Sequence, residues 1–325
     1  MLKKSVIILF LFVCLKQGWS QQFPSYTNYS MNKFIYNPAV AGSEGYTSIN
    51  LIAREQWVGF KGTPKTHAIT IDSRILGNSF ILSKLSVRKK KPRKTKSGNT
   101  GWGAYLFNDL NGPIDKTGVN GTYSHHISLG NSQLSFGLGI SLFQLKIQGD
   151  QFIFADDTPD DILTGKKQSI WITDANFGVY YTSRSLYGGY STMQLFNSSG
   201  QFGKNAEGEY KLVRQHNLVG GYNIGVTRNL EIEPSFLLKI PEKSGAQFDL
   251  NAKCVYDGMY WGGLGFRTGS ALSVFGGVII ENYYIGYAFD YNFGSIHKTN
   301  FGSHEFVFSM RIGDTARRYK WLNTY

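Results

Sequence analysis

Histidine and clustered carboxylates, residue types that often carry chemistry, are present but badly spaced for a catalytic centre. His125 and His126 are adjacent, and adjacent side chains on a strand point to opposite faces, so the two cannot hold one metal together. The densest acidic group is Asp156, Asp157, Asp160 and Asp161. Calcium is conceivable there, but the spacing matches no EF-hand loop. Because Gly-x-Ser-x-Gly, His-Glu-x-x-His and phosphate-loop motifs are also missing, we predict no enzyme, no cofactor and no metal site.

Positive charge is concentrated in one segment. The formal net charge is +12, and residues 88–96 alone hold seven basic side chains. In a cytosolic protein such a run would favour nucleic acid. In an exported protein it favours peptidoglycan, anionic lipid or an acidic protein, or it is a solvated loop, so no nucleic-acid partner is predicted. The candidate partner contacts are Lys89, Lys90, Lys91, Arg93 and Lys94.

The first 20 residues predict export. Lys3 and Lys4 precede an apolar run from Val6 to Leu15, and Gly18, Trp19 and Ser20 follow before Gln21. This is the pattern of a secretory signal peptide over residues 1–20, and the run is too short to span a bilayer comfortably. After its removal Cys254 is the only cysteine of the chain. An internal disulfide and a multi-cysteine metal site are therefore ruled out.

Alternating side chains predict strands in the rest of the chain. From Gln133 to Phe143, and again from Tyr283 to Gly294, large apolar residues alternate with small or polar ones. A period of two residues is typical of a strand with one apolar face. A soluble sandwich shows the same pattern, but export, 38 glycines and 15% aromatic residues favour an outer-membrane barrel.

We predict an all-β transmembrane barrel of about 14 antiparallel strands over residues 46–313. Residues 21–45 are expected to form an irregular segment, periplasmic or plugging the lumen, and residues 314–325 a tail.

Links after even-numbered strands are mostly short and those after the fifth and seventh are long, which places the short ones in the periplasm. The basic link 76–99 is the exception. The strands are expected at 46–57, 65–75, 100–110, 117–130, 133–148, 169–183, 185–197, 210–226, 229–241, 246–257, 259–268, 271–281, 283–294 and 302–312.

Inward-facing residues predict a filled, ion-paired lumen. Large side chains such as Tyr105, Phe107, Phe275 and Tyr284 take the inward parity, which favours a plugged interior. Unpaired charges there are costly, so partial pairing across neighbouring strands is expected. The charged residues concerned are Glu231, Glu233, Lys239, Asp249, Lys253, Arg267, Asp290, Glu305 and Arg311.

Two sequence blocks resemble a known family. They are Asn37-Pro38-Ala39-Val40-Ala41-Gly42 and Arg54-Glu55-Gln56-Trp57-Val58-Gly59-Phe60-Lys61-Gly62-Thr63-Pro64-Lys65-Thr66. Together they resemble the PorP/SprF family of outer-membrane proteins, associated with type IX secretion and gliding motility in the Bacteroidota. Further matches surround Asp290 and Glu305. The marked residues, which we expect mainly to stabilise the first hairpin, are Asn37, Pro38, Gly42, Arg54, Gln56, Trp57, Gly59, Gly62, Pro64 and Thr66.

The resemblance implies a function by protein contact. Such a barrel would bind and anchor secreted adhesins or their C-terminal sorting domains, or would link the secretion machinery to envelope proteins, within outer-membrane lipid. The long basic link and the tail depart from the family pattern and bear on the choice of partner. A porin or a transporter of hydrophobic solutes is the alternative, and the filling of the lumen distinguishes the two.

Overall fold

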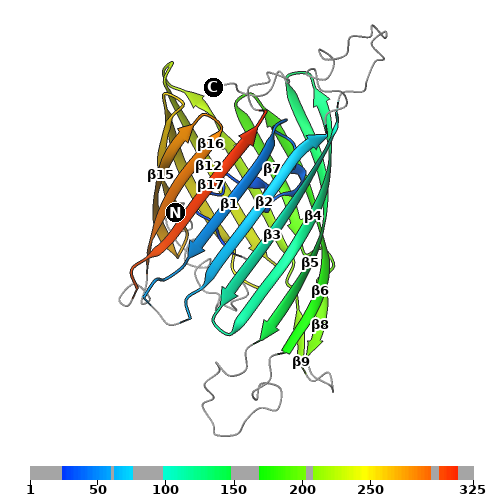
Figure 1. Cartoon of the computed structure of the whole chain (residues 1–325). Coiled ribbons are helices and arrows are strands. Elements are labelled where there is room, and N and C mark those ends of the chain that lie inside the picture. The colour runs from blue at the N-terminus through cyan, green and yellow to red at the C-terminus, as the bar shows by residue number, and fades with distance from the viewer. Residues whose placement is uncertain are drawn as a thin grey trace, which may run out of the picture.

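The computed structural model describes residues 24–59, 62–75, 98–147, 168–202, 208–293 and 300–313. They form a closed antiparallel barrel of 14 strands, which confirms the predicted fold class (Figure 1). Strand order follows the chain, and β1 closes the barrel by pairing with β17. The wall strands are β1 (Thr47–Glu55), β2 (Lys65–Ile75), β3 (Thr100–Asn111), β4 (Ile114–Leu129), β5 (Ser132–Ile147), β6 (Gln168–Ser183), β7 (Leu186–Met193), β10 (Gln215–Tyr222) continued by β11 (Ile224–Gly225), β12 (Leu230–Pro241), β13 (Gln247–Tyr256), β14 (Tyr260–Arg267), β15 (Ala271–Ile280), β16 (Tyr283–Asn292) and β17 (Ser303–Ile312).

The wall is apolar outside and polar inside. On β5, Leu138 and Ile140 are 61% and 66% exposed, whereas Gln133 and Ser135 are both 0% exposed. Cys254 also faces outward, as the alternation predicts. An outward apolar band is what a barrel needs in order to sit in a bilayer, where every backbone group must be bonded within the wall. None of the described helices is long and apolar enough to cross a membrane.

One region of the strand prediction was wrong. A wall strand was expected from residue 210, but β10 begins at Gln215, and a separate hairpin forms from β8 (Ser199–Phe202) and β9 (Gly208–Lys211). The chain leaves the wall after β7 because Gln194 adopts a left-handed φ of 56°. Asp174 on β6 then accepts the backbone N–H groups of the following segment. A strand of only four residues, such as β8 or β9, has too few alternating positions to be distinguished from a loop in the sequence.

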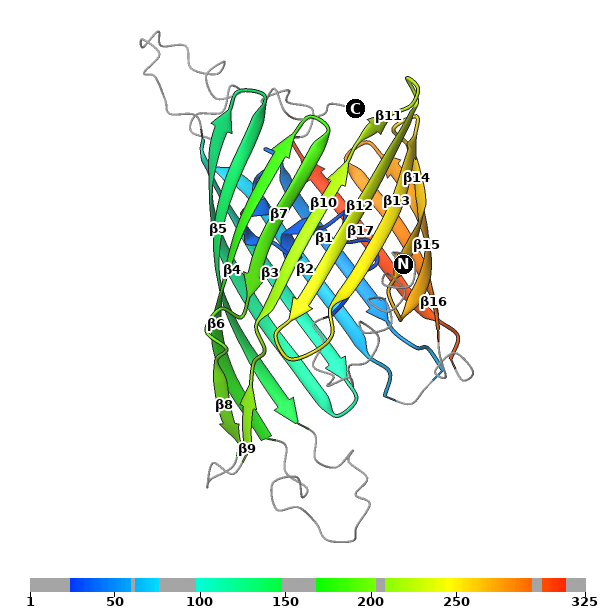
Figure 2. The same cartoon turned by 180° about the vertical axis from the view of Figure 1, so that it is seen from behind.

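The N-terminal segment lies inside the barrel, where Figure 2 shows it in dark blue. Residues 24–45, the lumen segment hereafter, include the 3-10 helices η1 (Lys33–Ile35) and η2 (Pro38–Val40). Tyr26 and Tyr29 are each only 1% exposed, and together with Phe34 they belong to a hydrophobic cluster that includes inward residues of the wall. The core of this barrel is therefore in its lumen.

The links gather at two opposite ends (Figures 1 and 2). The short-turn end carries the turns after β4, β6, β11, β13 and β15, and the long-link end carries the links after β1, β3, β7, β12, β14 and β16. The basic link joins β2 to β3 at the short-turn end, although residues 76–97 lie outside the described ranges. The short turns are on the side that the alternation predicts, although the links after β3 and β14, at the long-link end, are equally short.

Cysteine labelling is expected to show the long-link end on the cell surface. Arg228 and Lys243 are exposed in links at the short-turn and long-link ends respectively. In a Cys254→Ala background, Lys243→Cys should react with an impermeant maleimide on intact cells, because short turns face the periplasm in such barrels. Arg228→Cys should react only after permeabilisation. The reverse pattern would invert the assignment of the two ends.

Candidate functional site in the barrel lumen

Arg54 on β1 is the centre of a buried ion-pair cluster. Its Nη2 lies 2.6 Å from Asp290 Oδ2 on β16, and its Nη1 lies 3.0 Å from Glu305 Oε2 on β17. All three side chains are at most 2% exposed. Arg54 and Glu305 are direct partners across the β1–β17 pairing that closes the barrel. This group, the Arg54 cluster hereafter, therefore joins the first and last strands from inside.

The carboxylates of this cluster also hold the lumen segment. Glu305 accepts the backbone N–H of Thr27 at 2.8 Å and that of Asn28 at 2.9 Å. The Thr27 hydroxyl donates to Asp290 at 2.8 Å. Hydrogen bonds to ionised groups are about twice as strong as neutral ones. The lumen segment is thus fastened at the same carboxylates that close the wall.

Further polar contacts fix the lumen segment on other sides of the wall. Asn32 Nδ2 donates to Thr70 on β2 at 2.8 Å. Asn251 Nδ2 on β13 donates to the Thr27 carbonyl at 2.9 Å. Lys239 on β12 hydrogen-bonds to the Ser25 hydroxyl. Because these partners come from separated strands, the segment bridges the lumen and does not line one wall alone.

The expected pairing of inward charges is found for most of the residues named. Arg267 lies 3.1 Å from Asp249 and 3.4 Å from Asp290, and Glu233 pairs with Lys253. Lys239 binds a serine of the lumen segment, and the Arg311 guanidinium lies 3.9 Å from the centre of the Tyr284 ring. Among the described residues Glu231 has no ion pair. The lumen charges are therefore mostly used for structure, as their cost on burial requires.

The Asn-Pro block anchors η2 against β5, β6 and β7. Asn37 caps η2, since its Oδ1 accepts the Ala39 N–H at 2.9 Å, and its Nδ2 donates to the carbonyls of Val179 and Tyr190. Pro38 is the first residue of η2, a position where its missing N–H costs nothing. Gly137 on β5 faces this turn of η2, and a Cβ at position 137 would collide with the backbone of Pro38 and Ala39. Glycine at position 137 is thus needed for the close approach of the segment to the wall.

Gly42 turns the chain from the lumen segment toward β1. Its φ of +66° is in the left-handed region, and a Cβ there would meet the Ser73 carbonyl oxygen at 2.7 Å. Its N–H donates to Asp72 on β2 at 3.0 Å. Nearby, the Ser124 hydroxyl donates to the Ala41 carbonyl at 2.6 Å. The turn that Pro38 and Gly42 were expected to bracket therefore leads from inside the barrel into its wall.

The other marked residues lie in the link between β1 and β2, except Thr66, which is the second residue of β2. The Gln56 N–H donates to the Pro64 carbonyl at 2.9 Å, and the Thr66 hydroxyl donates to Asp109 on β3 at 2.6 Å. β1 ends at Glu55, two residues earlier than expected, because Trp57 has a left-handed φ of 53°. Glycine supplies the other positive φ angles, at Gly59 and Gly62. The residues from Gln56 to Pro64 shape the hairpin link, whereas Arg54, Thr66 and the Asn-Pro block face the lumen.

The histidines and acidic residues do not assemble a reactive group in the described ranges. His126 points inward, with its ring nitrogens 2.8 Å from Ser135 Oγ and 3.2 Å from Ser124 Oγ, whereas the neighbouring His125 is exposed. No set of three or more His, Cys, Asp or Glu in those ranges could hold a metal ion. Asp156, Asp157, Asp160 and Asp161 lie outside the described residues.

Sequence reasoning placed Arg54, Asp290 and Glu305 in the lumen but missed Thr27 and Asn28.

A sequence profile described as "Type IX secretion system membrane protein PorP/SprF" matches residues 19–310. The chain belongs to the PorP/SprF family. It is an outer-membrane barrel of type IX secretion. In this PorP/SprF protein both marked blocks contact the lumen, the first through Asn37 and the second through Arg54.

Solved structures resemble this PorP/SprF chain at low sequence identity. The toluene transporter TbuX of Ralstonia pickettii is 12% identical with a TM-score of 0.48, covering 88% of this chain and 93% of its own. A FadL homologue of Pseudomonas aeruginosa is 9% identical with a TM-score of 0.42, covering 90% and 95%. The translocator domain of the autotransporter NalP from Neisseria meningitidis is 10% identical with a TM-score of 0.40, covering 88% and 94%. Curated proteins give no match.

Proposed function

We propose that this protein acts by holding protein partners at the ends of its barrel, and not by conducting solutes through it. The observation that supports this is the lumen segment, which lies inside the barrel and is fastened by the Arg54 cluster through Thr27 and Asn28. A segment held by several charge-assisted hydrogen bonds is costly to displace. The surfaces left for function are the two ends of the barrel.

The partners proposed for the two ends differ in kind. At the long-link end we place secreted adhesins or their C-terminal sorting domains, which the barrel would bind and anchor. At the short-turn end we place proteins that link the secretion machinery to the envelope. Binding at either end requires neither catalysis nor a cofactor.

The basic link is the proposed docking arm of the short-turn end. β2 ends at Ile75 and β3 begins at Thr100, both at this end, so the intervening residues start and finish there. Seven positive charges within residues 88–96 favour fast association with an acidic partner. Such association weakens with salt, because exposed charges are screened within about 10 Å at 0.1 M salt.

Affinity capture from crosslinked cells tests this assignment. The wild-type protein should recover envelope-linking proteins at low salt and less of them at high salt. A variant with Gln in place of Lys89, Lys90, Lys91, Arg93 and Lys94 should lose these proteins and keep the adhesin. The matched control carries five Lys→Gln changes between wall strands at the opposite end, at Lys166, Lys167, Lys204, Lys211 and Lys243. Equal recovery of envelope proteins by all three at both salt concentrations would show that the basic link is not a docking arm.

A further inference from the structure

The barrel wall is taller on one side at the long-link end (Figure 2). β4, β5 and β6 have 16 residues each, whereas β13 to β17 have eight to ten. β6 pairs with β5 along its whole length, from Gln168 to Ser183, but with β7 only from Phe177 to Thr182. Within the described ranges, no strand pairs with the second side of residues 168–174. We call this stretch the β6 edge.

The chain that follows β7 passes inside the β6 edge. The inward carboxylate of Asp174 accepts the N–H groups of Phe196 and Ser198, each at 2.9 Å. β8 then lies against inward side chains of β6, since a Cβ at Gly200 would come within 2.7 Å of Ile170 Cδ1. Among the described strands, β8 and β9 pair only with each other. This hairpin therefore covers the inner face of the β6 edge and leaves the backbone open on the side away from β5.

Three residues present their backbone groups on that open side. The Ala175 carbonyl accepts the Leu195 N–H at 2.8 Å, so it points away from β5. In an antiparallel strand the backbone groups of every second residue point to the same side. Ser169, Trp171 and Thr173 therefore each direct an N–H and a carbonyl away from β5. In the part of the chain that the structure describes, none of these groups has a hydrogen-bond partner.

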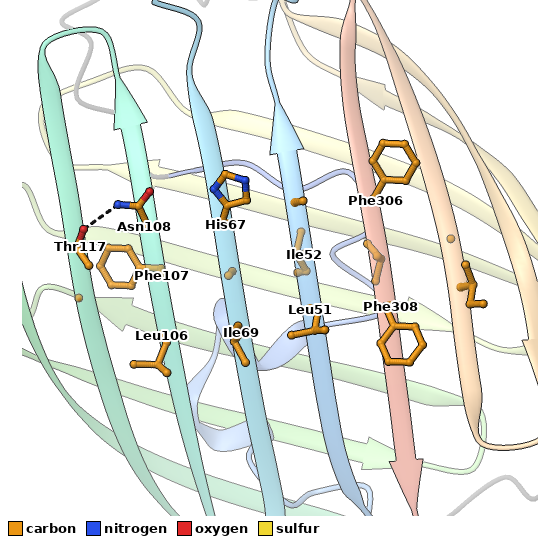
Figure 3. Close-up of a pocket in the computed structure, with 16 residues that line it drawn as sticks. Leu51, Ile52, His67, Ile69, Leu106, Phe107, Asn108, Thr117, Phe306 and Phe308 are labelled. Atoms are coloured by element: carbon orange, nitrogen blue, oxygen red, sulfur yellow. Dashed lines mark hydrogen bonds between the residues drawn. The ribbon is translucent and has the colours of Figure 1, made fainter.

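The β6 edge lies at the end of the apolar band of the outer wall. Figure 3 shows Asn108 bonded to Thr117 above Leu106 in that view, so a polar row follows the apolar one toward the long-link end. Thr117 is the register partner of Gln144 on β5, and Gln144 is that of Trp171. Unpaired backbone groups do not occur on lipid-exposed edges in the hydrocarbon region of a membrane. The open side of the β6 edge is therefore available to a protein at the long-link end.

Because the proposed function places secreted proteins at the long-link end, we propose that the β6 edge binds an extended segment of such a protein, which adds to the wall as one antiparallel strand. Donors and acceptors that repeat every second residue match the backbone of an extended chain, whereas a lipid or a small solute offers no such repeat. The side chain of Trp171, which is 62% exposed, packs against an outward side chain of the added strand.

A second copy of this barrel fits the β6 edge less well. Each described pairing between wall strands is antiparallel. Two copies inserted in the same membrane run in the same direction, so β6 of one could pair with β6 of the other only in parallel, which is slightly less stable per residue. A strand of a secreted protein can approach in either direction and so can continue the antiparallel ladder.

Thr173→Pro tests the pairing, and Thr173→Val is its matched control. The Thr173 N–H is on the open side, so proline removes one donor of the edge and keeps the hydrogen bonds of β6 with β5. Valine retains this N–H and removes only the hydroxyl. The probe is the purified, fluorescently labelled sorting domain of the adhesin that the wild type captures, titrated onto the full-length protein in nanodiscs. Proline should weaken its binding by roughly tenfold, because an acceptor of the bound strand loses its partner, and valine should bind as the wild type does.

Hydrogen exchange in the wild type gives a second measurement, which does not depend on how the proline variant folds. The amides of Ser169, Trp171 and Thr173 should exchange fast in the free protein and more slowly with the sorting domain bound. Equal binding by the proline and valine variants, or no slowing at these amides, would overturn this site and leave the proposed function standing. A sorting domain that does not bind the wild type at all would overturn both. Slowing that already appears at high protein concentration without the sorting domain would assign the edge to a second copy.

Discussion

Replacement of Arg54 with methionine is expected to destabilise the folded barrel by about 3–5 kcal/mol. The substitution leaves Glu305 buried without its cation and leaves Asp290 with Arg267 alone, at 3.4 Å. An uncompensated buried charge costs far more than a surface one. Urea unfolding in detergent micelles, followed by tryptophan fluorescence and by the gel mobility of the folded form, measures the change. The lumen segment should also become accessible to protease, because its contacts to the two carboxylates weaken.

Lys65→Met is the matched control for the loss of stability expected of Arg54→Met. Lys65 is also a cation on a wall strand near the long-link end, but its pair with Glu55 is exposed, and exposed pairs contribute about 0–1 kcal/mol. Removing the carboxylate charges as well, in Arg54→Met with Asp290→Asn and Glu305→Gln, should restore part of the stability, because no charge is then left unpaired. Equal destabilisation by Arg54→Met and Lys65→Met would contradict a structural role for the buried cluster.

The wall could be predicted because its pattern is local. Alternation along Gln133–Phe143 assigns the faces of β5 from the sequence itself, and the same rule places Arg54, Asp290 and Glu305 inside. A membrane barrel enforces this rule strictly, since one face meets lipid and the other the lumen. The inward charges were correctly expected to pair in part, because burial of single charges is unfavourable.

The contacts of the lumen segment could not be predicted in the same way. Thr27 and Asn28 bind Glu305, which lies 278 and 277 positions later in the chain, and an irregular segment has no period that reveals which strands it touches. Gly137 and Ala39 are similarly remote. The sequence signal for this packing is the number of glycines within the strands, which indicates a crowded interior without identifying what occupies it.

Deletion of residues 24–42 is expected to turn a closed barrel into a conducting one. With the lumen segment in place, Tyr26, Tyr29 and the Asn-Pro block are packed inside the barrel, so the wild type should show no steady current in planar bilayers. A barrel of 14 strands is wider than the eight-stranded barrels whose side chains alone fill the interior. Ion flux should therefore rise on the order of tenfold or more when the segment is removed.

Two controls keep this result interpretable. Deletion of residues 314–325, which follow the last strand, should leave the wild-type current unchanged. A synthetic peptide of residues 24–42 added to the deleted barrel should reduce its current, because the binding groups on Arg54, Asp290, Glu305 and Asn251 remain in the wall. If the intact protein already conducts as well as the deleted one, the segment does not close the lumen, and a porin or solute transporter becomes the better assignment for this barrel.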